Sequence, residues 1–303
     1  MIRFKVVRAS RVLLFVAAAI LVAVLCLVGA RWALERREPS AAANAQLIQA
    51  RPGAARALSA FAPGGGGIVV ERVTPTPAPT PTPAPTARPS VLIYHTHTHE
   101  AYEQVSDDPY DAVEAWRTTD AGHSVVRVGE ELARCLREAG FEVVHDATDH
   151  EGDALSTAYT RSLATLEGYE RPFDLYIDLH RDAWIRGMEL RYVCEDGERC
   201  AQPMLLIGNG NGFDVKPHTE ENLAFARELT RNVNRLQPGL CKDVLVKDGR
   251  YNQHIGVFSV LIEVGHNKNT LREALNTVPI LARAIRQTFD APGPELKKVM
   301  GKS

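Results

Sequence analysis

The chain has 303 residues and a formal net charge of −2, with 35 Lys and Arg residues against 37 Asp and Glu residues. This balance excludes the strongly basic footprint of a general nucleic-acid-binding protein, so no nucleic-acid partner is expected. The five cysteines show no paired CxxC spacing, which argues against a zinc ribbon.

An uninterrupted apolar run extends from Val12 to Ala30 and follows a basic N-terminus. At about 1.5 Å per residue, it nearly spans the ~30 Å hydrocarbon core of a membrane. The basic flank predicts a cytoplasmic segment 1–11, a transmembrane anchor 12–30 and a remainder on the extracytoplasmic side, as in a single-pass cell-membrane protein. Val28-Gly29-Ala30 also resembles a signal-peptide cleavage site, which leaves a cleaved signal peptide as the alternative. The length of the apolar run favours the retained anchor.

Residues 31–89 show no persistent helical or strand period, so we expect a disordered region. From Thr74 to Pro89, proline occupies nearly every second position. Proline fixes φ and removes hydrogen-bond donors, which predicts an extended, polyproline-like linker. At about 3.1 Å per residue this spacer reaches roughly 50 Å. An anchor followed by a stiff spacer indicates a domain that works at a distance from the membrane.

Residues 90–290 alternate between short apolar runs and longer amphipathic runs. The predicted strands are Val91–Tyr94, Phe141–His145, Leu175–Leu179, Met204–Ile207 and Ser259–Val264, and the predicted helices are Ser124–Ala139, Ala154–Leu166, Glu220–Leu236 and Thr270–Phe289. The strands are apolar on both faces, which is typical of a covered, mostly parallel sheet. We therefore predict an α/β domain, a three-layer sandwich, with residues 291–303 as a C-terminal tail.

Two cysteines of the domain flank a turn-like stretch. Cys194 and Cys200 lie on either side of Glu195-Asp196-Gly197-Glu198-Arg199. Outside the cytosol, a disulfide that closes this hairpin is plausible. Cys135 lies on the first predicted helix and is expected to be a buried thiol, with a bond to Cys241 as the alternative.

All ten histidines lie beyond residue 94, and His95, His97 and His99 alternate directly after an apolar strand. Alternation places three imidazoles on one side of an extended chain. Imidazole is the commonest protein ligand of divalent transition metals. The run, which ends in Glu100, therefore predicts a metal site at the carboxyl edge of the sheet. The alternative is a histidine-rich surface loop.

Three predicted strands end in or near histidine or glutamate side chains that could bind a metal or transfer a proton. The first leads into the run from His95 to Glu100, the third into His180, and the last contains Glu263. In open α/β sheets the site lies beyond the carboxyl ends of the strands, where these side chains can converge. Two imidazoles and a carboxylate leave a tetrahedral zinc ion one open position for water, and a further carboxylate can accept the proton of that water.

Several segments resemble the stage II sporulation protein P family, in the order that the family has them. They cover about residues 90–290 and are Ile93–Tyr102, Ile177–Asp182, Glu221–Ala226, Tyr251–Gln253, Leu261–Gly265, and Asn269-Thr270 followed by Glu273-Ala274. The resemblance implies a fold similar to zinc-dependent N-acetylmuramoyl-L-alanine amidases.

The implied activity is peptidoglycan hydrolysis at the membrane around a developing forespore. Family members cut the amide between N-acetylmuramic acid and L-alanine and are credited with endopeptidase action on stem cross-links. The implied partners are the stage II sporulation proteins D and M. Two alternatives remain, namely a non-hydrolytic wall-binding scaffold of the same fold and a zinc hydrolase of another exported peptide.

The same resemblance assigns roles to individual residues. His97 matches the first zinc ligand, His180 the second, and Glu263 the catalytic acid/base. The third ligand stays open. Glu100 is the carboxylate within the motif and is preferred, whereas the related amidases use an acidic residue at the start of the first helix, where this chain has Asp120 and His123. His123 is therefore the alternative.

Three further residues have two interpretations each. His95 could support the ligands or be an ordinary polar position. Asp178 lies two positions before His180 on the same side of the strand, so it could orient that ligand or serve as a buried hydrogen-bond acceptor. Arg181 could bind substrate carboxylates or pair with Asp182.

Overall fold

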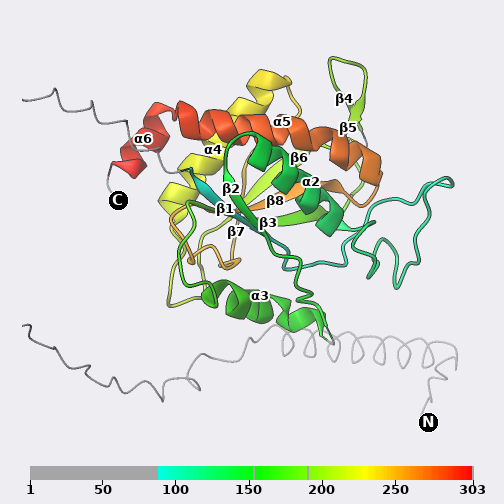
Figure 1. Ribbon diagram of the computed structural model, residues 1–303, viewed down its shortest axis with the longest axis horizontal. Coiled ribbons are helices and arrows are strands. Elements are labelled where there is room, and N and C mark those ends of the chain that lie inside the picture. The colour runs from blue at the N-terminus through cyan, green and yellow to red at the C-terminus, as the bar shows by residue number, and fades with distance from the viewer. Residues whose placement is uncertain (1–87, 153, 190, 302–303) are drawn as a thin grey trace, which may run out of the picture. The chain divides into compact units, whose positions relative to one another are not determined.

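The computed structural model describes residues 88–152, 154–189 and 191–301 (Figure 1). A six-stranded sheet with the order β2-β1-β3-β8-β6-β7 forms its centre. The strands are β1 (Ser90–Tyr94), β2 (Glu142–His145), β3 (Leu175–Asp182), β6 (Pro203–Gly208), β7 (Leu245–Lys247) and β8 (Ser259–His266). Strands β2, β1, β3 and β8 are parallel to one another, whereas β6 runs antiparallel to β8. The predicted mostly parallel sheet is confirmed.

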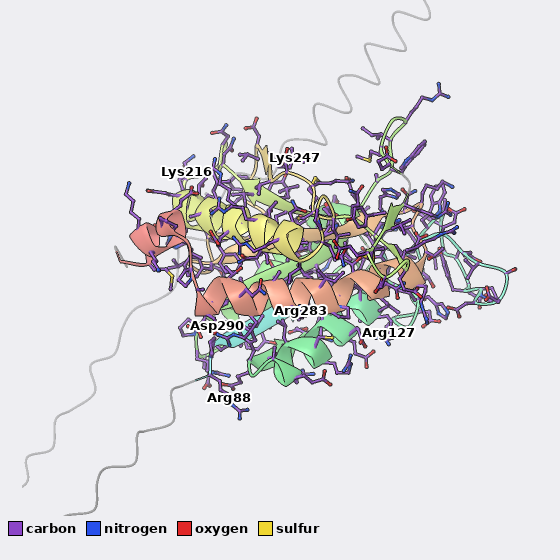
Figure 2. The ribbon with its side chains drawn as sticks, turned by 90° about the horizontal axis from the view of Figure 1, so that it is seen from above. Arg88, Arg127, Lys216, Lys247, Arg283 and Asp290 are labelled. Atoms are coloured by element: carbon purple, nitrogen blue, oxygen red, sulfur yellow. A yellow bond between two sulfur atoms is a disulfide. The ribbon has the colours of Figure 1, made fainter. Side chains whose placement is uncertain are left out.

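Helices cover the two faces of the sheet unequally. The larger layer consists of α2 (Val125–Glu138), α4 (Thr219–Leu236) and α5 (Leu271–Asp290), which lie side by side when viewed from above (Figure 2). On the other face lies α3 (Ala158–Glu167), which follows a 3₁₀ turn at Leu155–Thr157 (Figure 1). This arrangement fits the predicted α/β three-layer sandwich.

The two faces of β1 show why the sheet is covered on both sides. Val91 and Ile93 are buried in the main core with α2, α4 and α5, while Leu92 and Tyr94 point to a smaller cluster that includes Leu166 of α3. Successive side chains of a strand alternate between faces, so an uninterrupted apolar strand requires both layers.

Local signals fix the helix ends near the site. The Ser124 hydroxyl accepts a hydrogen bond from Val126 N and begins α2, and Gly140, just past its end, has a φ of +90°. At the start of α5, Thr270 and Glu273 form a reciprocal capping box. The capping side chains at the starts of α2 and α5 and the glycine after α2 are the local signals from which the sequence predicts helix ends.

A two-stranded hairpin carries the disulfide of the domain. β4 (Tyr192–Val193) pairs antiparallel with β5 (Arg199–Cys200), and Cys194 is bonded to Cys200, as predicted. Cys135 and Cys241 are both buried free thiols. The alternative bond between them is therefore absent.

The domain extends beyond its predicted end. Residues Pro294–Met300, within the predicted tail 291–303, form α6, and the side chains of Leu296 and Val299 are buried in the main core. Pro294 suits the first position of a helix, and the two apolar residues, three positions apart, share one face.

The predicted segments 1–11 and 12–30, and all of 31–89 except Arg88 and Pro89, lie outside the described residues. Within residues 88–301, as far as they are described, no helix is long and apolar enough to cross a membrane.

Candidate active site

The predicted strand ends meet at one edge of the sheet. β1, β3 and β8 are direct neighbours, and His180 of β3 is the register partner of Glu263 of β8. β3 and β8 both continue past their predicted ends, which brings His180 into the regular sheet. Parallel pairing of these strands therefore brings His180 and Glu263 together.

His97 lies in the loop directly after β1 and faces β3. Its ring meets the His180 ring edge-on, with centroids 5.4 Å apart, and the Tyr159 ring of α3 at 5.7 Å. The strand end and the first turn of α3 thus hold the His97 ring from two sides.

His180 lies between two carboxylates. Its Nε2 is 2.8 Å from Asp178 Oδ1 and its Nδ1 is 3.3 Å from Glu100 Oε2. Burial alone would lower the pKa of His180, but Asp178 and Glu100 raise it well above its ordinary value. The two carboxylates therefore favour the positively charged form of the imidazole.

The two carboxylates are themselves held in place. Asp178 accepts hydrogen bonds from the Thr96 amide and hydroxyl at 2.8 and 2.7 Å. Burial would raise the pKa of Glu100, but the hydrogen bond from His180 and the charges of His180 and Arg181 hold it at about 2. Asp178 therefore contacts both the His180 ring and Thr96, which is compatible with either interpretation of this residue.

Arg181 stabilises the loop that carries Glu100. Its amide donates to Glu100 Oε2 at 3.0 Å, and its guanidinium donates to the carbonyls of Ala101 and Trp116, both at 3.0 Å. The sequence analysis considered substrate binding or pairing with Asp182 for Arg181 and did not indicate these hydrogen bonds to the loop backbone.

Glu263 is a carboxyl group of the site whose pKa is raised, whereas the pKa values of Glu100 and Asp178 are lowered. Burial raises the pKa of Glu263 to about 8, with Glu100 and Asp182 adding to the shift and His180 opposing it. Its Oε2 is buried without a hydrogen-bond partner. A carboxylate of this basicity, aimed into a polar site, is suited to take up a proton.

The structure separates two predicted residues from this group. His95 is buried beneath α2, where its Nδ1 contacts the Leu179 carbonyl at 2.8 Å and its Nε2 contacts His145 Nε2 at 3.0 Å. His123 lies at the far end of the long loop between β1 and α2, where it contacts Asp120 and Asp108 at 2.7 and 3.0 Å. His95 thus contacts the backbone of β3 on the face that α2 covers. His123 contacts carboxylates of its own loop.

Whether a zinc ion fits can be judged from the donor set. Among the residues that the structure describes, no group of three or more His, Cys, Asp and Glu side chains is arranged to hold a metal as it stands. The chemistry nevertheless fits. His97 and His180 are close enough to reach one ion at zinc–nitrogen bonds of about 2.0–2.1 Å. Asp178 and Glu100, which lie 2.8 and 3.3 Å from the two ring nitrogens of His180, attract a cation.

Sequence reasoning missed a segment that contacts the histidine loop. Asp149 and Glu151, which follow β2, contact His99 and His97, and Tyr159 packs on the His97 ring. Asp149 and Glu151 lie in a stretch that reads as an ordinary polar loop, and Tyr159 lies in the helix that follows, so only the proximity of the β1 and β2 ends could reveal their contacts.

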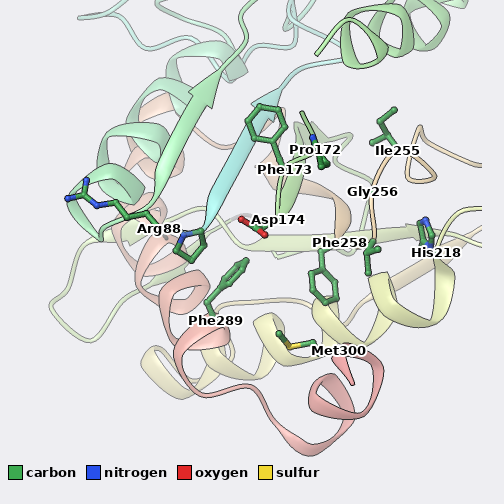
Figure 3. Close-up of a pocket in the computed structure, with 12 residues that line it drawn as sticks. Arg88, Pro172, Phe173, Asp174, His218, Ile255, Gly256, Phe258, Phe289 and Met300 are labelled. Carbon is green, nitrogen blue, oxygen red and sulfur yellow. The ribbon is translucent and has the colours of Figure 1, made fainter. Parts of the chain in front are cut away.

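A separate apolar cavity lies at the opposite edge of the sheet. It has a volume of about 680 Å³ and is lined by residues that precede the strands, including Pro89, Asp174 and Phe258 (Figure 3). Since these residues mark the amino ends of β1, β3 and β8, this cavity is distinct from the site at the carboxyl ends.

Solved structures with similar folds include several amidases at low sequence identity. The N-acetylmuramoyl-L-alanine amidase from Clostridium difficile 630 has 14% identity and a TM-score of 0.42, covering 69% of this chain and 100% of its own. The CwlD amidase from Clostridioides difficile, solved in complex with the GerS lipoprotein, has 14% identity and a TM-score of 0.39, covering 70% and 99%. The catalytic domain of CwlV from Bacillus (Paenibacillus) polymyxa has 14% identity and a TM-score of 0.38, covering 71% and 99%.

No curated protein matches the chain at a significant level. The sequence does match one family profile, that of stage II sporulation protein P (SpoIIP), over residues 45–286. The match takes in every strand of the sheet and each of the three residues His97, His180 and Glu263. The chain therefore belongs to the stage II sporulation protein P family.

Proposed function

We propose that this protein is a zinc-dependent peptidoglycan hydrolase that cleaves the N-acetylmuramoyl-L-alanine amide during sporulation, with endopeptidase action on stem cross-links as a second activity. The observation that supports it best is the convergence of His97, His180 and a half-buried Glu263 with a raised pKa at one sheet edge. Membership of a sporulation family gives the biological setting.

His97 and His180 would hold the zinc ion, and Glu100 is the preferred third ligand. Glu100 already contacts the His180 ring, whereas His123 contacts Asp108 and Asp120. Histidine binds a metal only when it is neutral, so zinc competes with protons for these rings, and zinc affinity should fall as the pH is lowered. The chemistry that bound zinc supplies is polarisation of the scissile carbonyl and activation of water at neutral pH.

Glu263 would provide the acid/base function. Its carboxylate takes the proton of the attacking water and then gives it to the leaving nitrogen of L-alanine. Burial raises the pKa of Glu263 to about 8, near neutral pH, which suits a group that takes up a proton and gives it back, and Oε2 has no hydrogen-bond partner. Asp178, fixed by Thr96, keeps the His180 ring in one orientation.

The remaining proposals concern location and partners. The apolar run at 12–30 would anchor the chain in the cell membrane with the domain on the extracytoplasmic side. Stage II sporulation proteins D and M are the proposed partners on the basis of the family.

Product analysis on purified sacculi tests the function. Amidase action should release intact stem peptides that begin with a free L-alanine amino group, and endopeptidase action should reduce cross-linked stems. Glu263→Gln serves as the matched inactive control. Wall binding without release of either product would support the scaffold alternative, and cleavage confined to another peptide would support the second alternative.

A further inference from the structure

Three consecutive residues after β2 contact the loop after β1. Asp149 Oδ1 accepts a hydrogen bond from the Thr98 hydroxyl at 2.9 Å, and His150 Nδ1 donates to the His95 carbonyl at 2.7 Å. Glu151 contacts His97 and His99. Because β1 and β2 are parallel neighbours, their carboxyl ends bring these two loops together.

Of the three residues, Glu151 is the one that contacts His97, the first proposed zinc ligand. Its side chain is only 4% exposed, and it is paired with the Arg117 guanidinium. One carboxylate oxygen, Oε1, lies 3.4 Å from His97 Nδ1, and the other, Oε2, lies 3.1 Å from His99 Nδ1. The buried Glu151 carboxylate therefore faces Nδ1 of His97, and the Arg117 guanidinium compensates the negative charge of that carboxylate.

The Nδ1 atom of His97 is buried and makes no hydrogen bond in this structure. Its distance to Glu151 is slightly longer than the normal range of about 2.7–3.2 Å. A buried N–H without an acceptor is costly, so a small movement that closes this gap is favourable. A proton on Nδ1 leaves the lone pair of His97 on Nε2. Metal-binding histidines commonly donate their second ring nitrogen to a carboxylate in this way, which fixes both tautomer and ring orientation.

We propose that Glu151 is a positioning residue for His97: it accepts the Nδ1 proton and thereby presents Nε2 as the metal-binding nitrogen. This inference rests on the proposed zinc function. It adds a residue that the histidine motif does not contain and gives the loop after β2 a direct role in the site. Tyr159 restrains the ring by packing, and Glu151 selects its tautomer.

The test compares two substitutions that break the same ion pair. Glu151→Gln removes the carboxylate from His97, whereas Arg117→Gln removes the pairing partner and leaves the carboxylate beside His97. Zinc affinity of the full-length protein is measured by competition with a chelator, and circular dichroism establishes that each variant is folded. We expect about 10- to 100-fold weaker zinc binding for Glu151→Gln, the usual effect of losing such a contact, and less than about 3-fold for Arg117→Gln.

A second measurement reads the tautomer directly. In the metal-free protein, ¹⁵N chemical shifts of His97 should report a proton on Nδ1 in the wild type and a shift toward a mixture of tautomers in Glu151→Gln. If Glu151→Gln does not fold, Glu151→Asp replaces it, because a shorter carboxylate keeps the charge and retreats from His97.

Equal zinc affinity in Glu151→Gln and wild type, or equal losses in both variants, would overturn the proposal. So would an Nε2-protonated His97 in the wild type. If the wild type binds no zinc, the proposed function fails, and the tautomer measurement still decides whether Glu151 controls His97.

Discussion

His180 and Glu263 are register partners on the adjacent parallel strands β3 and β8, so one strand pair joins a proposed metal ligand to the proposed acid/base. Their separation is set by regular sheet geometry and not by a loop. Because β3 and β8 are both buried on the main-core side by Ile177, Leu179 and Ile262, this pair is held on a rigid element.

The first prediction concerns the ligands. The purified protein should bind close to one zinc ion per chain, and His97→Ala or His180→Ala should lose it, because two remaining ligands rarely retain zinc against water. Metal analysis after gel filtration measures this, with His218→Ala as control, since His218 lines the cavity at the opposite sheet edge. Full zinc retention in both ligand variants would reject the assignment.

Glu263→Gln should separate binding from chemistry. The amide preserves the size of the side chain but cannot accept a proton at neutral pH. We expect near-normal folding and zinc content with hydrolysis of sacculi reduced by about 10²–10⁴-fold. Turnover equal to that of the wild type would place the acid/base role on another residue.

The contact between the buried His95 and the half-buried His145 should make the domain sensitive to acid. Burial, together with the neighbouring His145, lowers the pKa of His95 to about 3, and burial also lowers the pKa of His145. In the unfolded chain His95 titrates near 6.5, so between pH 6.5 and 3 the unfolded state binds more protons. Stability is therefore lost as the pH falls through this window, by about 1.4 kcal/mol per pH unit for one such group.

Urea unfolding of the metal-free protein at pH 7, 6 and 5 measures this dependence. His145→Gln removes one of the two rings while its amide can still donate to His95, so its stability should depend less steeply on pH. A slope identical to that of the wild type would assign the acid sensitivity to other groups.

The disulfide should stabilise the domain moderately. Cys194 and Cys200 are six positions apart, and closing so short a loop is worth about 2 kcal/mol in the chain-entropy account. Replacing both by alanine should lower the free energy of unfolding by that order, and Cys135→Ala, which removes only a free thiol, serves as comparison. Peptide mapping of protein exported to the extracytoplasmic side of the membrane should find the bond between Cys194 and Cys200. Two free thiols in that protein would contradict the prediction.

The proline-rich segment 74–89 should matter through its length. If the domain must reach the wall from the membrane, deletion should abolish wall cleavage in cells and leave activity on soluble fragments intact. A Gly/Ser replacement of equal length has a shorter mean extension, about 5–6 Å times the square root of the residue number, and should give an intermediate loss. Undiminished cleavage after deletion would reduce the segment to a tolerated linker.

The sequence by itself determined most elements of the domain and pointed to residues of the candidate site. Apolar runs such as Val91–Ile93 and capping residues such as Ser124 act locally, so strands, helix ends and the mostly parallel sheet follow from periodicity and turn chemistry. The histidine run after the first strand, His180 and Glu263 were recognisable because each is attached to an apolar strand and parallel strands end at a common edge. Within that run, only the resemblance to the family singled out His97.

Only the tertiary structure decided which neighbours surround these residues. His95 and His97 are two positions apart and looked equivalent, yet His95 is buried under α2 against His145 while His97 faces His180. Glu151 lies far along the chain from His97 and becomes its neighbour only because β1 and β2 pair. Contacts of this kind depend on the order of strands in the sheet and on the packing of helices against it. They arise between segments distant in sequence, and therefore no local pattern records them.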